Sequence, residues 1–213
     1  MQIGFELPNR PDVGLDTWEQ VDALRSSVVK VRPYHLSSAD TIHHIQRRGL
    51  AVLLRHDADG EIDVPARVRE LSRAAWTLRE HGIGDITIII DNEPNHTNGG
   101  PDTPCPPDYW QKVSQVVTGL YYGHFDTRPL AGTVRYASPP MAVAQGEAAW
   151  YESGRDIISA FDVVCVHLYG QTDNSLVTYA LQLASVFGKP MIADEVGNTD
   201  QQVNLLVAEK AAE

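Results

Sequence analysis

Hydrophobic residues in this chain gather in short runs that alternate with stretches of helical periodicity. The clearest run is residues 86–90, Ile-Thr-Ile-Ile-Ile, which is typical of a strand buried on both faces of a parallel sheet. The clearest amphipathic stretch starts at Pro65 and ends at Gly82. Strands are predicted at residues 3–7, 28–31, 50–54, 86–90, 130–134, 162–166 and 191–193, each followed by a predicted helix.

Seven strand–helix repeats in strict alternation predict an α/β protein with a parallel sheet. The closed form of such a sheet is the TIM-type (β/α) barrel, and an open, doubly wound sheet is the alternative fold. Polar residues end nearly every predicted strand, whereas an open sheet concentrates its site at one switch point. We therefore predict a barrel with its cleft at the carboxyl ends of the strands.

The eighth βα unit of a complete barrel is not found in the sequence. Residues 201–212 are predicted to form a last helix, and no apolar strand follows them. Three options remain: a seven-stranded barrel, an edge completed by a partner chain, as in a homodimer, or a fragment of a longer protein. The 213 residues fit a single domain, predicted to span residues 1–213, better than two domains.

Charge and composition narrow the choice of partners. The net charge is −11 and no basic run offsets it, so we expect no nucleic acid and no membrane partner, whereas a neutral sugar is compatible with this field. Met1 is followed at once by a predicted strand, so no signal peptide is expected and a cytoplasmic location is suggested. A protein released by cell lysis or as part of a larger assembly would have the same kind of N-terminal sequence. Cys105 and Cys165 lack the spacing of metal ligands or of a disulfide framework, and we expect no metal and no cofactor.

Two of the predicted strands end in a glutamate. Glu93 follows residues 86–90 in Asp-Asn-Glu-Pro-Asn, and Glu195 follows residues 191–193 in Asp-Glu-Val-Gly. Two carboxyl groups across one cleft suit the cleavage of a glycosidic bond, because one donates a proton to the leaving oxygen and the other attacks the anomeric carbon. Their environments must then push their pKa values apart. A pair of solvated turn acids is the alternative interpretation.

Other polar strand ends supply candidate substrate-binding residues. Arg32 would hold Glu195 ionised if the two lie close together, and Tyr169 could orient the same carboxylate. Asn92 could bond a sugar hydroxyl beside the anomeric centre. His56 is either a site residue or a buried core histidine. The full set of candidate substrate-binding residues is Arg32, His56, Asn92, Tyr136, His167 and Tyr169.

Asp194 competes with Glu195 for the place in the cleft. Successive side chains of a strand point to opposite faces, so an inward Asp194 would turn Glu195 toward a helix. By the same alternation, His167 and Tyr169 share one face, which supports a joint role.

The glutamates and their neighbours resemble clan GH-A of the glycoside hydrolases. The resemblance rests on Asn92-Glu93-Pro94 after the fourth strand and Glu195 after the seventh, and it extends from Met1 to about Asn198. It implies a retaining (β/α)8 enzyme that hydrolyses β-glycosidic bonds of an oligo- or polysaccharide, with Glu93 as acid/base and Glu195 as nucleophile. Family 5 of that clan adds an Arg ending strand two, a His ending strand three and a His-x-Tyr ending strand six, which Arg32, His56 and His167-Leu168-Tyr169 match.

The chain departs from that family because no eighth strand is found in its sequence. The family usually carries an aromatic sugar platform there, often Trp, and Tyr136 is the candidate that replaces it. The chain is also short for the clan, so a catalytically weak or inactive carbohydrate-binding barrel is a second hypothesis. A metal-dependent hydrolase is the third and weakest, because the histidines lack the His-x-His pairing expected of a first-strand metal site. It would use His56, Asp57, Glu93, His167 and Asp194.

Overall fold

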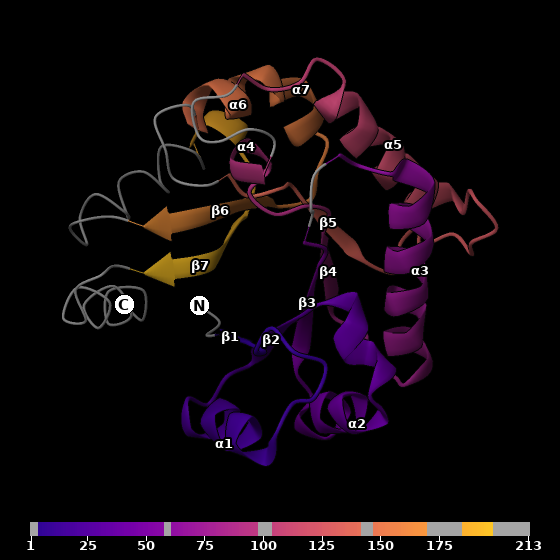
Figure 1. The fold of residues 1–213 in the computed structure, drawn as a ribbon, viewed down its shortest axis with the longest axis vertical. Helices are drawn as coiled ribbons and strands as arrows, with labels where there is room; N and C mark the ends of the chain where they lie inside the picture. Colours follow the sequence, from indigo (N-terminus) through magenta and orange to yellow (C-terminus); the bar gives the residue numbers. More distant parts are fainter. Residues whose placement is uncertain (1–3, 58–60, 98–103, 142–146, 170–184, 198–213) are drawn as a thin grey trace. The chain divides into compact units, whose positions relative to one another are not determined.

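The computed structural model describes residues 4–57, 61–97, 104–141, 147–169 and 185–197 (Figure 1). They divide into two compact units, each of which is described by itself. The N-terminal unit covers Gln2–Asn92 and Gln111–Tyr136, and the C-terminal unit covers Glu93–Trp110 and Ala137–Glu213. None of the helices in the described segments combines the length and the apolarity that a membrane span requires.

A parallel sheet with the order β1-β2-β3-β4-β5 organises the N-terminal unit. The pairs β1–β2, β2–β3 and β3–β4 are all parallel, so each connection crosses over through a helix. This is the βα alternation that the sequence predicts. The strands are β1 (Gly4–Glu6), β2 (Val28–Val31), β3 (Ala51–Arg55), β4 (Ile86–Ile89) and β5 (Arg135–Ala137) (Figure 1).

Strands β2 and β4 are buried at every residue, as expected of strands covered on both faces. Helix α3 (Val64–Glu80) packs against this sheet at β3, and its apolar residues recur on one side. Val68, Leu71, Ala75 and Leu78 are all fully buried. The side chain of Asp63 caps the helix by accepting from the backbone N–H of Ala66 at 3.0 Å.

The other helices of this unit follow the same logic. They are α1 (Leu15–Ala23), the 3-10 helix η1 (Pro33–Ser37), α2 (Ala39–Arg48) and α5 (Tyr109–Tyr122), whose first turn belongs to the C-terminal unit. In α2 the side chain of Ser38 accepts from the backbone N–H of Thr41, and Gly49 ends the helix with φ 63°, a conformation that favours glycine. Within α5, a Cβ added to Gly119 would lie 2.8 Å from a methyl group of Val68, so the glycine lets α5 approach α3 closely.

The prediction of the fifth strand at residues 130–134 is wrong. That segment is a turn, in which Gly132 has φ 69° and the backbone N–H of Thr133 donates to the carbonyl of Leu130 at 3.0 Å. The strand starts at Arg135, and Arg135 forms an exposed ion pair with Asp85 instead of ending the strand. Apolar residues on either side of a tight turn imitated the pattern of a strand.

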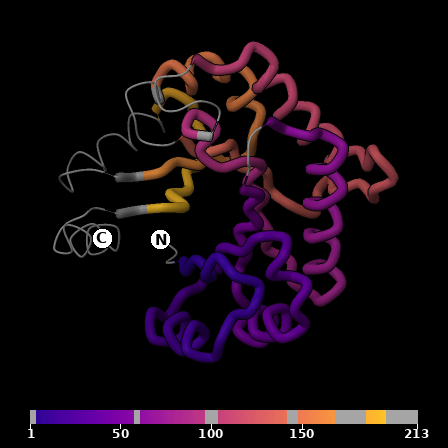
Figure 2. Tube along the Cα trace, viewed as in Figure 1, coloured from indigo at the N-terminus to yellow at the C-terminus, as the bar shows by residue number. Residues whose placement is uncertain are grey.

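A two-stranded parallel sheet organises the C-terminal unit. Strands β6 (Val164–Tyr169) and β7 (Met191–Gly197) lie side by side, in orange and yellow in Figure 2. They extend past the predicted ends, so His167, Asp194 and Glu195 lie inside strands and not after them. The described helices of this unit are α4 (Pro94–Thr97), α6 (Glu147–Ser153) and α7 (Arg155–Ile158), and the break between α6 and α7 falls at Gly154.

Aromatic side chains form the core beside these helices. Tyr109 packs edge-on against Trp110 and Trp150, with ring centroids 5.1 and 5.3 Å apart. The indole N–H of Trp110 donates to Ser153 Oγ at 3.0 Å, and a Cβ at Gly154 would lie 2.1 Å from the same indole ring. Only glycine therefore fits at the break in the helix.

The described strands form one five-stranded and one two-stranded sheet, and not a closed ring. Among the described residues, an isolated parallel bridge joins Ala137 to Val163, both of which belong to the C-terminal unit. The prediction that an eighth unit is missing falls on residues 198–213, which lie outside the described residues, as does the predicted helix before β7 up to residue 184.

Candidate active site

Glu93 stands at the carboxyl side of β4 in a strained backbone conformation. Its φ is +46°, in the left-handed region that costs an L-residue roughly 1–2 kcal/mol. The surroundings impose this conformation: the N–H of Glu93 donates to the carbonyl of Pro140 at 3.0 Å, and its carbonyl accepts from His96 N–H at 2.8 Å. Strain of this kind is retained at functional sites.

The residues before Glu93 are anchored to the N-terminal unit. Arg67 of α3 donates from Nη1 to the carbonyl of Ile90 at 2.8 Å, and the same atom lies 3.6 Å from Asp91 Oδ1. Asp91 is fully buried, and its side chain also accepts from the N–H of Asn92 at 2.9 Å. The backbone that leads to Glu93 is therefore fixed by a buried ion pair.

His167 of β6 lies at the centre of three carboxyl groups. Its Nδ1 is 2.8 Å from Glu93 Oε1, and its Nε2 is 3.1 Å from Asp194 Oδ1 and 3.9 Å from Glu195 Oε1. The side chains of His167 and Asp194 are fully buried, whereas Glu93 is 27% and Glu195 21% exposed. We call these four residues the acid–histidine cluster. Two of its acids are thus accessible to a ligand, and one is not.

A β-bulge in β7 explains how two adjacent acids reach the same histidine. Val166 pairs with Ala193 but His167 pairs with Glu195, so Asp194 is an extra residue in the ladder. The expectation that Asp194 and Glu195 point to opposite faces is therefore wrong, because a bulge interrupts the alternation of side chains. The sequence carries no glycine or proline at Asp194 that would have signalled the bulge.

The charge of His167 follows from its neighbours. Burial of the imidazole lowers its pKa, but the ion pair with Asp194 and the hydrogen bond with Glu93 outweigh burial and raise the pKa from 6.5 to about 9. His167 is therefore an imidazolium at neutral pH. It donates a charge-assisted hydrogen bond to Glu93, which is stronger than a neutral one.

The cluster also has the spacing of metal ligands. Glu93, His167 and Glu195 each offer one ligand atom, and these atoms lie within 4.8 Å of one another. A metal ion, however, needs the lone pair of a neutral imidazole, whereas both ring nitrogens of His167 lie within hydrogen-bonding distance of a carboxylate oxygen, Glu93 Oε1 and Asp194 Oδ1. The direct bond between Nδ1 and Glu93 also occupies the atoms that a metal would use. The cluster fits proton sharing better than metal binding.

Arg32 belongs to a second charged group, which we call the cation cluster. Arg32 Nη2 lies 2.8 Å from Glu6 Oε1, and its Nε pairs with Asp57. Lys30 Nζ lies 2.9 Å from Glu6 Oε2, and Arg55 is 3.3 Å from Glu6 and 2.8 Å from Asp57. Burial would lower the pKa of Arg32, but Asp57 and Glu6 raise it.

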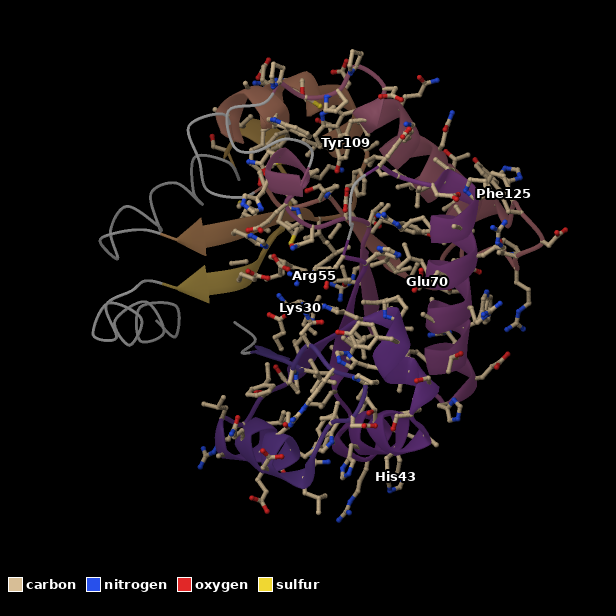
Figure 3. The ribbon with its side chains drawn as sticks, in the orientation of Figure 1. Lys30, His43, Arg55, Glu70, Tyr109 and Phe125 are labelled. Atoms are coloured by element: carbon tan, nitrogen blue, oxygen red, sulfur yellow. The ribbon has the colours of Figure 1, made fainter. Side chains whose placement is uncertain are left out.

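The three cations of this cluster are buried, and Figure 3 labels Lys30 and Arg55. The prediction that Arg32 ends the second strand is confirmed, and its pairing with Glu195 stays a prediction.

The sequence analysis did not identify Glu6, because an acid in a first strand has no distinctive motif. Its signal was Lys30, a lysine within the apolar run Val-Val-Lys-Val, since a buried lysine needs a partner.

The other predicted binding residues are placed as follows. His56 Nε2 bonds Glu70 Oε2 at 2.9 Å, and burial together with Arg67 lowers the His56 pKa. Asn92 is half-buried beside Glu93, and its Oδ1 accepts no hydrogen bond within the described residues. Tyr136 is buried within β5. The side chain of Tyr169 lies outside the described residues.

Searches by sequence find nothing: no protein-family model and no curated protein matches this chain. Solved structures do match. A family 128 (subgroup VI) exo-β-1,3-glucanase from Aureobasidium namibiae superposes with a TM-score of 0.62 at 16% identity, over 97% of this chain and 75% of that one. A family 5 glycoside hydrolase from Prevotella bryantii B14 gives 0.61 at 12% identity, over 92% and 76%.

A structure from a study of two fungal β-1,4-galactanases gives a TM-score of 0.58 at 14% identity, over 83% of this chain and 64% of that one. The matched region thus spans less than two thirds of the galactanase and about three quarters of the other two enzymes. These matches confirm the predicted fold, which is an α/β fold of the TIM-barrel type like that of family 5 and family 128 glycoside hydrolases.

Proposed function

We propose that the protein is a glycoside hydrolase that cleaves β-glycosidic bonds by a retaining double displacement, with Glu93 as acid/base and Glu195 as nucleophile. One observation carries the proposal: an oxygen of Glu93 and an oxygen of Glu195 lie within 4.8 Å of each other, next to the same histidine. Retaining enzymes hold their carboxyl groups about 5–5.5 Å apart, and inverting enzymes roughly 6.5–9.5 Å apart. The short separation supports retention, because it leaves no room for a water molecule between the second carboxylate, Glu195, and the anomeric carbon.

The chemistry needs two steps. In the first, the Glu195 carboxylate attacks the anomeric carbon while the Glu93 carboxyl group gives its proton to the departing glycosidic oxygen. In the second, the Glu93 carboxylate takes a proton from water, and this water displaces Glu195 from the sugar. The imidazolium of His167 stabilises the Glu93 carboxylate that exists between the two steps.

The proposed substrate is a neutral, β-linked oligo- or polysaccharide. The fold neighbours are an exo-β-1,3-glucanase, β-1,4-galactanases and a family 5 enzyme whose mutant was crystallised with a xyloglucan tetradecasaccharide. A net charge of −11 disfavours an acidic polymer. We propose that the substrate is contacted by Arg32, His56, Asn92, Tyr136, His167 and Tyr169.

The test is hydrolysis of a panel of aryl β-glycosides and β-glucans, with product stereochemistry followed by NMR. Glu195→Ala should abolish turnover. Glu93→Ala should still react with substrates that have good leaving groups, then stall until added azide releases a β-azide product. Glu152→Gln is the matched control, because Glu152 is an exposed acid of α6 paired with Arg155. Unchanged hydrolysis of an unactivated β-glycoside by Glu93→Ala would reject the assignment.

A carbohydrate-binding barrel without turnover is the second candidate. The observation that favours it is the low sequence identity of 12–16% to the matched hydrolases, because chains that share a fold at this level need not share an activity. Calorimetric binding of a β-glucan oligosaccharide with no product after prolonged incubation supports this candidate. Covalent labelling of Glu195 by a 2-deoxy-2-fluoro-β-glycoside excludes it.

Pairing of two chains through an incomplete barrel edge is also proposed, because exposed strand edges invite such pairing. Light scattering coupled to size-exclusion chromatography measures the mass directly. A mass near the 23.5 kDa of one chain, at all concentrations, rejects the dimer.

A further inference from the structure

Asp194 has no part in the two-step reaction, yet its side chain is the most deeply buried of the three acids in the acid–histidine cluster. Its side chain is fully inaccessible and lies 3.1 Å from His167 Nε2. An ionised carboxyl group in such a position is expensive unless a cation and hydrogen bonds compensate it. No substrate can reach Asp194, so its effect on chemistry must pass through His167.

The backbone of β7 is distorted at this residue. A regular strand would turn the side chain after Ala193 toward His167 and the next one away, but the bulge brings both Asp194 and Glu195 to the histidine. Bulges that re-aim a side chain are typical of strands next to active sites. The distortion therefore brings Glu195 to a histidine that Asp194 also contacts.

The neighbourhood holds Asp194 in one orientation. Cys165 of β6 donates from Sγ to the same Oδ1 at 3.2 Å. Cys165 is itself fixed, because its N–H donates to Ser138 Oγ at 3.1 Å and its carbonyl accepts from the Tyr151 hydroxyl at 3.3 Å. Asp194 thus faces His167 as part of a rigid support.

Carboxyl groups on both sides of the ring select the protonation state of His167. The charged groups that face it are Glu93 at Nδ1, and Asp194 and Glu195 at Nε2. A neutral imidazole carries one N–H, so one nitrogen would present its lone pair to a carboxylate. Only the doubly protonated ring satisfies both sides while the acids are ionised.

We propose that Asp194 is a positioning residue of the site: it keeps His167 doubly protonated, so that His167 Nδ1–H holds the Glu93 carboxyl group by its Oε1 and fixes its orientation. The catalytic part of this inference rests on the proposed role of Glu93 as acid/base. The pKa of about 9 for His167 agrees with it. In Asp194→Asn, the side-chain amide could hydrogen-bond to His167 in either protonation state, because an amide both donates and accepts hydrogen bonds. The imidazolium would then lose a proton near neutral pH.

The first experiment needs no substrate. The ring nitrogens of 15N-labelled protein are observed by NMR between pH 5 and 10, and His167 is assigned by its absence from His167→Gln. In the wild type both nitrogens should remain protonated at pH 7.5. In Asp194→Asn the titration midpoint should fall by at least one pH unit. Asp156→Asn, an exposed acid of α7, is the control and should change nothing.

A wild type with a neutral His167 at pH 7.5 would overturn the inference, and so would an unchanged midpoint in Asp194→Asn. If Asp194→Asn does not fold, the titration of His167 in the wild type alone decides.

The second experiment is the pH profile of turnover. Asp194→Asn should lower kcat roughly 10- to 100-fold with little change in KM, less than the 10²–10⁴-fold due to general acid catalysis, and should lower the upper pH limit of activity.

An equal loss of kcat at every pH, or a rise in KM alone, would assign Asp194 a structural role instead. Because the NMR experiment uses no substrate, the inference about His167 can succeed where the glycosidase proposal fails, and the reverse.

Discussion

The acid–histidine cluster and the cation cluster balance charge in opposite ways. In the first, the carboxyl groups of Glu93, Asp194 and Glu195 surround one imidazole. In the second, three cations share two carboxylates: Lys30, Arg32 and Arg55 with Glu6 and Asp57. Lys and Arg keep their charge at every pH near neutrality, whereas histidine does not. One cluster is therefore constant, and the other depends on a single proton.

The largest expected difference between the clusters is in turnover. Glu195→Gln should lower kcat about 10³-fold or more, because the amide cannot attack the anomeric carbon. It should not lower the free energy of unfolding, since it relieves repulsion among three crowded acids. Assays on an aryl β-glycoside, with urea unfolding of the same preparation, measure both. Loss of stability together with activity would make Glu195 a structural residue.

The pH dependence of stability should come from the acid–histidine cluster. The pKa of His167 is about 9 in the folded chain against 6.5 for the free side chain, so its stabilisation is complete below pH 6.5 and disappears as the pH rises through 9. The loss is at most about 3 kcal/mol. Urea unfolding at pH 6 and 9.5 measures it, and His167→Gln should remove this part of the difference. If the free energy of unfolding of His167→Gln falls between pH 6 and 9.5 by as much as that of the wild type, the effect belongs to other groups.

The cation cluster should depend on Glu6. Glu6→Gln removes a carboxylate shared by Arg32, Arg55 and Lys30 and should cost about 2 kcal/mol, less than the 3–5 kcal/mol of a fully buried pair because Glu6 is 36% exposed. The loss should be equal at pH 6 and 9. Glu80→Gln is the control, since its ion pair with Arg128 is more than half exposed and worth under about 0.5 kcal/mol. Equal effects of the two substitutions would contradict the buried network.

The smallest predicted effect concerns the backbone at Glu93. At φ +46°, glycine is unstrained and alanine is not. Glu93→Gly should therefore be about 1 kcal/mol more stable than Glu93→Ala, although both remove the carboxyl group. Thermal unfolding of the two variants gives the comparison. A more stable alanine variant would mean that the left-handed conformation is not kept in solution.

Periodicity was sufficient to predict β2, β4 and α3, because these elements bury their residues as their patterns require. It failed at residues 130–134, where apolar residues flank the turn at Gly132. Strand ends led correctly to Glu93, Glu195 and His167 as one group, since parallel strands bring their carboxyl ends together. The contacts of Arg32 with Glu6 and Asp57 were not predictable from spacing, because partners of buried charges are chosen by the folded geometry.

The bulge at Asp194 has a consequence for the register of β7. It gives β7 one residue more than the stretch of β6 that it faces, so the residues after Asp194 pair one position later than the register of Met191–Ala193 would place them. Deletion of Asp194 should therefore leave Glu195 opposite His167 in a regular ladder.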